Sequence, residues 1–217
     1  MFFDAKPHPA WTIVPLDDVR DRYDLGEISQ DSVYLEDLYG EEPEHFFVHH
    51  GDVAVDGPLV AEDDSGDEIS TLYVIDGDLT VDGPAVFRNG DSNTALYVTG
   101  SVTVRSLVCL NHGQFFVGGS LIVEDLLFTG LDDAGHLVVH GPVTAGAWIE
   151  AAGRGAIYFP APPAARLVGD PGNPYFDGGT ERERFEDAMH PDLVDADGRP
   201  RRRTVVQAVL GGRPVLR

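Results

Sequence analysis

The sequence predicts an all-β solenoid, a right-handed parallel β-helix of about five coils. The first observation is a nine-residue phrase that recurs five times around a central glycine, as in Tyr73–Val81 and Leu137–Ala145. The central glycines are Gly51, Gly77, Gly100, Gly119 and Gly141. They lie 26, 23, 19 and 22 residues apart, which is the period range of solenoid repeats. Coils of variable length near 22 residues favour the right-handed form over the strict hexapeptide left-handed form.

The second observation is that apolar residues alternate on both sides of each glycine. The positions four and two before the glycine, and two and four after it, form almost purely apolar rows. These rows are Phe47/Tyr73/Leu96/Phe115/Leu137, His49/Ile75/Val98/Val117/Val139, Val53/Leu79/Val102/Leu121/Val143 and Val55/Val81/Val104/Val123/Ala145. A period of two is typical of strands with one buried face, so each row is expected to stack inside the solenoid.

The third observation is a further apolar piece after each phrase. These pieces are Leu59–Val60, Ala85–Phe87, Leu107–Cys109, Leu126–Phe128 and Trp148–Ile149. Three short strands per repeat, with a glycine corner between the first two, describe one triangular coil. Glycine suits this corner because it tolerates positive φ and the close approach of another backbone. Successive coils would stack about 4.8 Å apart.

Rows that face outward indicate where other segments pack. An apolar stripe three positions before the glycine consists of Val48, Val74, Tyr97, Phe116 and Val138. A contiguous external stripe of this kind should be covered by another segment or by a partner, so these five are the interaction candidates. The expected cover within the chain is its C-terminal third.

Two more outward rows follow the glycine. A mostly β-branched row consists of Ala54, Thr80, Thr103, Ile122 and Thr144, and a charged row of Asp56, Asp82, Arg105, Glu124 and Gly146. The alternation of sign along Asp82, Arg105 and Glu124 indicates stabilising pairing between neighbouring coils.

The repeat divides the chain into three parts. Residues 1–45 contain no copy of it and are expected to cap the solenoid, whose open strand edges would otherwise invite aggregation. The β-helix should occupy residues 46–159, where a sixth coil begins and is cut off by prolines. Residues 160–217 should form a Pro/Gly-rich linker and a helical extension, with helices at Thr180–His190 and Val205–Leu210. Phe185 and Met189 would dock on the outward apolar stripe.

Composition narrows the function classes. The net charge is −22, from 37 acidic residues against 15 Lys and Arg, which disfavours nucleic acid or an anionic membrane as the partner. No apolar run is long enough to span a bilayer, and the first residues do not resemble a secretory signal. The single cysteine, Cys109, cannot form an intramolecular disulfide, so a cytoplasmic location is expected. The acidity also suits a high-salt cytoplasm or a high-GC genome.

Chemistry-bearing residues are few. Asp52 and Asp78 should share an outward row just after the corner, with Asp76 nearby, and this acidic row is the best candidate for polysaccharide chemistry or calcium binding. A solvated corner acid is the favoured interpretation, because the row continues as Ser101, Ser120 and Pro142. The histidines lack companions at useful spacing for zinc. No catalytic residue, metal site or cofactor is therefore assigned. The arginines at 199–203 are expected to neutralise the acidic surface.

The five turns of the form Gly-[Asp/Ser/Pro]-[Val/Leu]-x-[Val/Ala], as in 77–81 and 119–123, resemble those of bactofilin-like, polymer-forming cytoskeletal β-helices. The resemblance covers about residues 46–159. It implies non-enzymatic, nucleotide-free assembly of coils end to end, without a cofactor. Shorter and more regular coils with disordered tails are usual in that family, whereas this chain has apparent caps at both ends.

These observations favour a non-enzymatic structural or protein-interaction scaffold that binds a protein partner or associates with itself. One alternative is an immunity-type inhibitor module whose acidic surface engages a basic partner. A second alternative is a carbohydrate-active enzyme built on the same fold.

Overall fold

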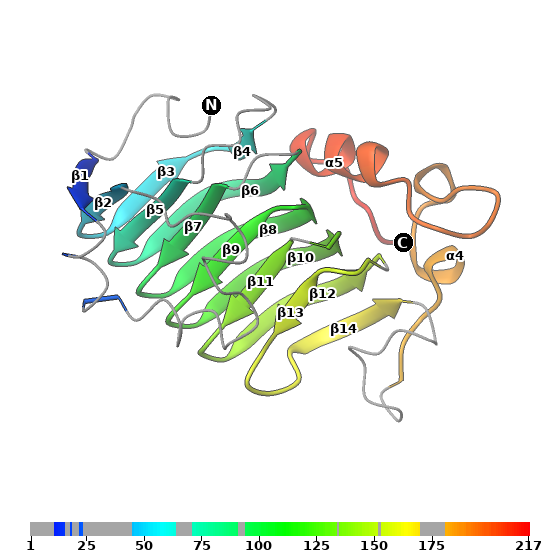
Figure 1. The fold of residues 1–217 in the computed structure, drawn as a ribbon. Coiled ribbons are helices and arrows are strands. Elements are labelled where there is room, and N and C mark those ends of the chain that lie inside the picture. The colour runs from blue at the N-terminus through cyan, green and yellow to red at the C-terminus, as the bar shows by residue number, and fades with distance from the viewer. Residues whose placement is uncertain are drawn as a thin grey trace.

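The computed structural model describes residues 11–15, 18, 22–23, 45–63, 71–90, 94–133, 135–151, 153–169 and 181–217. The chain winds into two stacks of strands, and the C-terminal helices lie on one side of them (Figure 1). The first sheet runs in the order β1 (Thr12–Pro15), β2 (His45–His50), β5 (Thr71–Asp76), β7 (Thr94–Val98), β9 (Gln114–Val117), β11 (His136–Val139) and β13 (Ala156–Tyr158). The second runs β14 (Ala164–Gly169), β12 (Val143–Glu150), β10 (Leu121–Leu131), β8 (Val102–Asn111), β6 (Leu79–Asn89) and β3 (Val53–Asp56), with β4 (Leu59–Asp63) also on β6.

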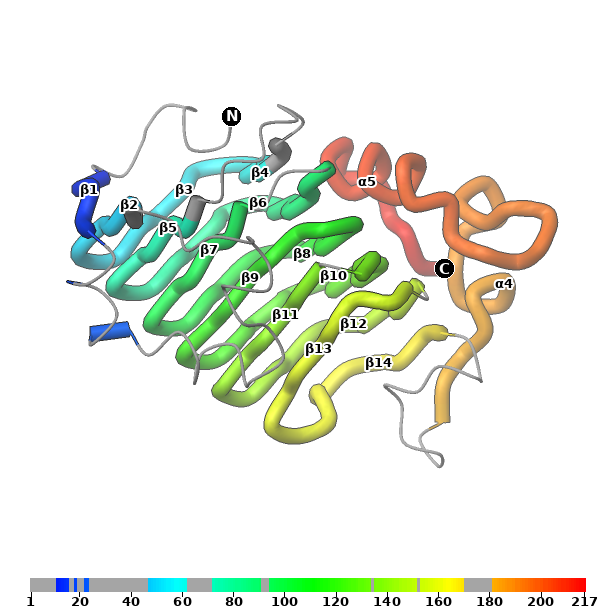
Figure 2. The backbone as a smooth tube through the Cα atoms, in the orientation of Figure 1, coloured from blue at the N-terminus to red at the C-terminus, as the bar shows by residue number. Residues whose placement is uncertain are grey.

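The predicted all-β parallel solenoid is confirmed. Every pairing between neighbouring coils is parallel, and among the described strands β1 alone pairs antiparallel, with β2. Figure 2 shows the backbone returning from one coil to the next in a continuous spiral. The glycine-aligned register is also the observed one, because Val53 pairs with Leu79, Leu79 with Val102 and Val102 with Leu121.

The coil has two strands rather than three over most of the solenoid. The predicted second and third strands join into one long strand in β6, β8, β10 and β12, and the register shifts at the join, for example between Val81 and Pro84. Only the first coil keeps them apart, as β3 and β4. A bulge bends a strand without ending it, so the corner that was predicted as a strand break is a bend.

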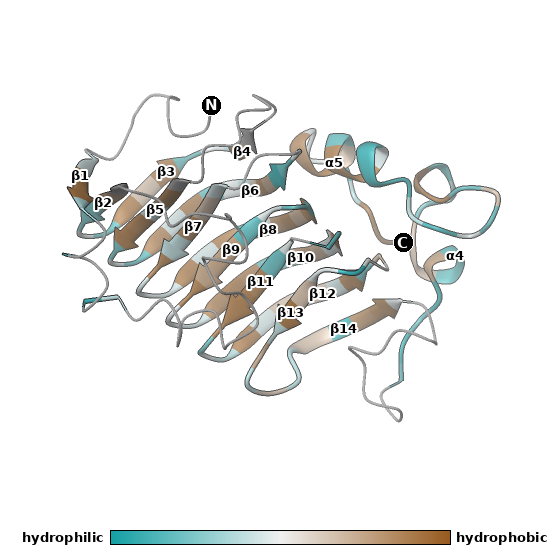
Figure 3. Cartoon of the chain, viewed as in Figure 1, coloured by the Kyte–Doolittle hydropathy of each residue, from teal (hydrophilic) through white to brown (hydrophobic). Residues whose placement is uncertain are grey.

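The predicted inward rows form the core. The main cluster of buried side chains joins both sheets, and Phe115, Leu121 and Leu137 within it have no exposed surface. The rings of Phe87 and Phe115 stack between coils, with centroids 4.4 Å apart. Figure 3 shows the apolar colouring continuing from strand to strand along both stacks. Cys109 lies in this core, and burial raises the pKa of its thiol.

The solenoid continues past the predicted end at residue 159. β13 pairs with β11, and β14 then pairs with β12, so a sixth coil is completed among the described residues. Pro160, Pro162 and Pro163 lie in the connection between β13 and β14 rather than ending the fold. Proline is tolerated there because the outermost coil has no following coil that needs its N–H.

The C-terminal extension packs on one side of the solenoid, as predicted, and that side is the outside of the second sheet. Its elements are α4 (Phe185–Ala188), η2 (Pro191–Leu193) and α5 (Arg202–Leu210). Of the helix expected at Thr180–His190, the described residues form only the single turn of α4, because the backbone of Glu183 is bonded to β14 instead. Thr180, its predicted N-cap, lies outside the described residues. The second helix is confirmed, begins earlier than predicted and is closed by Gly211, whose N–H bonds to the carbonyl of Gln207. No helix in the described ranges is long and apolar enough to cross a bilayer.

The expected docking of Phe185 and Met189 on the stripe of the first sheet is wrong. Both side chains pack against the second sheet, in a cluster that includes Val108 and Phe128. The stripe itself (Val48, Val74, Tyr97, Phe116 and Val138) is buried in a separate cluster that also contains Val14 and Tyr23. These five candidates are therefore packing residues within the chain. Most of the predicted N-terminal cap, residues 1–45, lies outside the described residues.

Aromatic residues close both ends of the interior. Trp11 lies against the first coils, with its ring 5.1 Å from that of Tyr73. Phe159 lies against the last coils, 5.2 Å from the ring of Trp148. At each end one strand edge is also covered: β1 pairs with β2, and the backbone of Glu183 bonds to β14 through Leu167 and Gly169.

Candidate interaction face

One sheet face stays uncovered among the described residues, and we call it the bare face. It is the outward side of β3 and of the first halves of β6, β8, β10 and β12. Its residues are Ala54, Thr80, Thr103, Ile122 and Thr144 in one row and Asp56, Asp82, Arg105, Glu124 and Gly146 in the next. Pairing in register places each member of the first row beside the next, from Ala54 to Thr144. Ile122, on β10, is 43% exposed and adds a large apolar side chain to this face.

The bare face is acidic. Asp56, Asp82 and Glu124 are exposed on it and Arg105 is its one cation. Arg105 contacts Asp82 at 3.7 Å, whereas the described contacts include none between Arg105 and Glu124, so the predicted alternating pairs are only half formed. An exposed pair at this distance contributes less than about 1 kcal/mol. The face therefore keeps an uncompensated negative charge that attracts a basic surface.

The corner acids beside the bare face are structural. Asp52 Oδ1 accepts the backbone N–H of Asp78 at 2.9 Å, Asp78 Oδ1 accepts that of Ser101 at 2.7 Å, and Ser101 Oγ accepts that of Ser120 at 3.1 Å. Each side chain thus satisfies a corner N–H in the next coil. The ladder ends at Pro142, which has no N–H to donate. The row therefore needs a short acceptor at Asp52, Asp78 and Ser101, and none at Ser120, because Pro142 follows it.

This ladder predicts a stability test. We expect Asp78→Ala to lower the free energy of unfolding by about 1 kcal/mol, because the Ser101 N–H loses a charge-assisted acceptor. Asp78→Asn keeps an acceptor oxygen and should cost less than half as much. Urea denaturation followed by circular dichroism measures both. Equal losses for the two variants would mean that the charge, rather than the hydrogen bond, matters at this corner.

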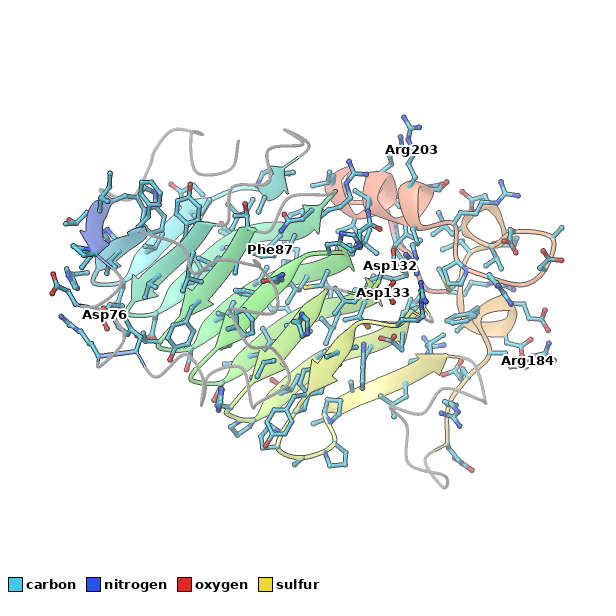
Figure 4. All side chains as sticks on the ribbon, in the orientation of Figure 1. Asp76, Phe87, Asp132, Asp133, Arg184 and Arg203 are labelled. Atoms are coloured by element: carbon cyan, nitrogen blue, oxygen red, sulfur yellow. The ribbon has the colours of Figure 1, made fainter. Side chains whose placement is uncertain are left out.

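Asp76 does not join the Asp52 and Asp78 row. It lies one position before the corner, far from Arg203 on α5 (Figure 4). Its Oδ2 is 2.6 Å from Arg22 Nη2 and 3.1 Å from His50 Nδ1, and Thr99 donates to Oδ1. Partial burial acts to raise the pKa of Asp76, but His50 and Arg22 outweigh it, so the pKa lies below the usual 3.8. Burial and the Asp76 charge raise the pKa of Tyr23 to about 12.

The role of Asp76 as an anchor for Arg22 predicts a pH dependence. A depressed carboxyl pKa contributes stability above the unfolded value near 3.8, and this stability is lost as the pH falls through the folded value. We expect Asp76→Asn to cost up to about 1 kcal/mol at pH 7, and the cost should shrink steadily as the pH falls below 3.8. Denaturation at pH 7 and at a series of pH values below 3.8 checks this. Asp187→Asn, at an exposed acid on α4, is the control and should have no effect at pH 7.

Sequence reasoning missed a polar cluster inside the solenoid. Thr129 and Glu150 are buried in adjacent coils, Thr129 donates its hydroxyl to Glu150 Oε2, and Trp148 Nε1 donates to Thr129 Oγ1 at 2.9 Å. The sequence signal for this cluster is that Thr129 and Glu150 occupy equivalent positions in two successive coils, in a row that is otherwise apolar. The cluster joins the last coils and has no opening to solvent through these residues.

A groove beside the bare face was also missed. It has a volume of about 720 Å³ and lies between the bulged corners of the second sheet and the chain that follows α5. Its two walls are more than 80 residues apart in sequence, so no local pattern predicts it. No group of three or more His, Cys, Asp or Glu in the described ranges is arranged to hold a metal ion.

The fold and this face define a capped parallel β-solenoid with one uncovered acidic sheet face. No protein-family model matches the chain, and neither the curated proteins nor the solved structures contain a significant match.

Proposed function

We propose that this protein is a non-enzymatic interaction scaffold that presents its bare face to a basic protein partner. The observation that carries the proposal is the contrast between covered and uncovered surfaces. The outer stripe of the first sheet and the far half of the second sheet are buried by other parts of the chain. The bare face stays open and combines uncompensated acids with the exposed side chain of Ile122, and protein interfaces use both apolar and charged groups.

The three acidic candidates have partners within the chain, which supports a role without catalysis. Asp52 and Asp78 accept backbone N–H groups, and Asp76 pairs with Arg22. A carboxylate pair for glycoside hydrolysis needs one acid and one base that converge on a substrate. These three carboxylates instead serve the corners and the N-terminal segment.

The ends of the solenoid favour a particle of fixed mass over a filament. End-to-end growth of the bactofilin type needs free strand edges at both ends, whereas here one sheet edge at each end is occupied, because β2 pairs with the antiparallel β1 and β14 bonds to Glu183. Light scattering over a range of protein and salt concentrations tests this: we expect a constant mass. A mass that rises without limit would favour polymerisation instead.

The interaction test uses variants matched for exposure. Ile122→Arg places a cation on the bare face, and Val60→Arg introduces the same cation at a residue that is 36% exposed outside it. A partner captured by the native protein, then purified and titrated, should bind Val60→Arg normally and Ile122→Arg at least tenfold more weakly. Its affinity should fall as salt rises. Equal binding to both variants would overturn the proposal.

A further inference from the structure

The groove beside the bare face is a built feature with two distinct walls. The solenoid wall consists of corner residues from four successive coils, among them Pro58, Pro84 and Leu126. The opposite wall is the end of α5 and the chain after it, with Val209, Leu210 and Val215. Four coils at about 4.8 Å give a length of about 14 Å, which is the span of about four extended residues. The volume lies in the range of ligand-binding clefts, roughly 300–1,000 Å³.

Hydrogen bonds and an ion pair hold the second wall in place. Gly212, with φ +65°, turns the chain after α5, and Arg213 Nη1 pairs with Asp192 Oδ2 at 2.5 Å. The N–H of His190 bonds to the carbonyl of Val215, and Arg217 Nε bonds to the carbonyl of Met189. The groove is therefore open without a movement of either wall, so the free-energy cost of ordering the walls when a ligand binds is small.

The charges of the groove indicate the sign of its occupant. Arg213 is paired with Asp192, and Arg105 lies near Asp82, so both cations have acidic neighbours. Asp125 lines the groove, is exposed and has no ion pair within the described part of the chain. Leu126, which is 5% exposed, and Leu210, which is 37% exposed, line the same groove. An occupant that matches these groups has a cationic side chain beside an apolar one.

We propose that this groove binds a short, extended peptide segment that carries a Lys or Arg next to an aliphatic residue. The cation pairs with Asp125, and the aliphatic side chain lies between Leu126 and Leu210. The proposal rests on the scaffold function, since the segment would belong to the basic partner of the bare face. The groove would add a second contact that recognises particular side chains of the partner, whereas the bare face recognises the partner's charge.

The test is a titration of the isotope-labelled full chain with acetyl-Val-Arg-Leu-amide, followed by amide chemical shifts. We expect shifts at Asp125, Leu126 and residues 210–216, and none with acetyl-Val-Glu-Leu-amide. Asp125→Asn should weaken binding at least fivefold, whereas the matched control Asp187→Asn should leave it unchanged. Binding of the acidic peptide with equal affinity, no shift at these residues, or no effect of Asp125→Asn would overturn the proposal.

The two proposals fail separately. If the cationic peptide leaves the groove unshifted while Ile122→Arg still abolishes partner binding, the groove assignment is wrong and the scaffold function stands. If the peptide binds but the partner binds Ile122→Arg as tightly as the native protein, the bare face is not the main interface. Shifts caused by a small organic cation such as arginine methyl ester, with the same affinity as the peptide, would contradict a peptide-specific groove.

Discussion

Gly77→Ala should destabilise the protein by about 3 kcal/mol or more, and it is among the most damaging single changes that we expect. A Cβ at Gly77 would lie 2.5 Å from the carbonyl carbon and oxygen of Gly51, in the coil before it. Both contacts are with backbone, so no side chain can move to relieve them. Relief would require separating two coils that share a ladder of hydrogen bonds. Urea denaturation gives the free energy of unfolding.

Gly51→Ala is the matched control, because it makes the same change at the same row of the first coil. Gly51 has φ +105° and nothing within 4 Å of a built Cβ. Its alanine would incur only the cost of a left-handed residue, about 1–2 kcal/mol. A larger loss at Gly51 than at Gly77 would mean that backbone angle, rather than coil stacking, selects glycine at this corner.

Thr129→Val should lower the free energy of unfolding by about 3 kcal/mol, although it preserves the shape of the side chain. Thr129 has no exposed surface, and its hydroxyl both donates to Glu150 and accepts from Trp148 Nε1. Valine removes both hydrogen bonds from groups that are buried in the core. Loss of a partner by a buried carboxyl group costs more than loss of a neutral one. Thermal and urea denaturation both report the change, and Trp148 fluorescence reports the local packing.

Two variants separate hydrogen bonding from packing at this position. Thr129→Ser keeps the hydroxyl and loses one methyl group, so we expect a cost of about 1 kcal/mol. Thr80→Val makes the same substitution on the exposed bare face and should change stability by less than about 0.5 kcal/mol. If Thr129→Val proves no worse than Thr80→Val, the buried cluster does not contribute to stability.

The course of the chain through the coils was predictable because a solenoid repeats one environment. The row that holds Leu79, Val102 and Leu121 was placed correctly, since each coil puts the same position over the same neighbour. The bulge between Val81 and Pro84 was not predicted, because Gly83-Pro84 is typical of a chain break as much as of a bent strand. The start of a sixth coil was predicted but its completion by β14 was missed for a similar reason, as Pro160, Pro162 and Pro163 interrupt the apolar pattern.

The candidate site was predicted less well than the fold. The sequence placed Asp52 and Asp78 on one row but could not distinguish an acid that meets solvent from one that accepts an N–H of the next coil. Asp76 was grouped with them, although its partner Arg22 comes from 54 residues earlier in the chain. Contacts of this kind involve residues outside the repeat, and periodicity carries no information about them.

By itself, the sequence determined that this protein is a parallel β-solenoid with glycine corners, an apolar interior and an acidic surface. These properties follow from short-range patterns that recur with each coil. Only the tertiary structure decided which segment covers which face: Val14 and Tyr23 join the stripe of the first sheet, and Phe185 and Met189 pack on the second. The physical reason is that an apolar stripe can pack against any complementary apolar surface. The alternation of apolar and polar residues along a strand does not specify which segment covers it. The bare face is what remains after those segments have packed.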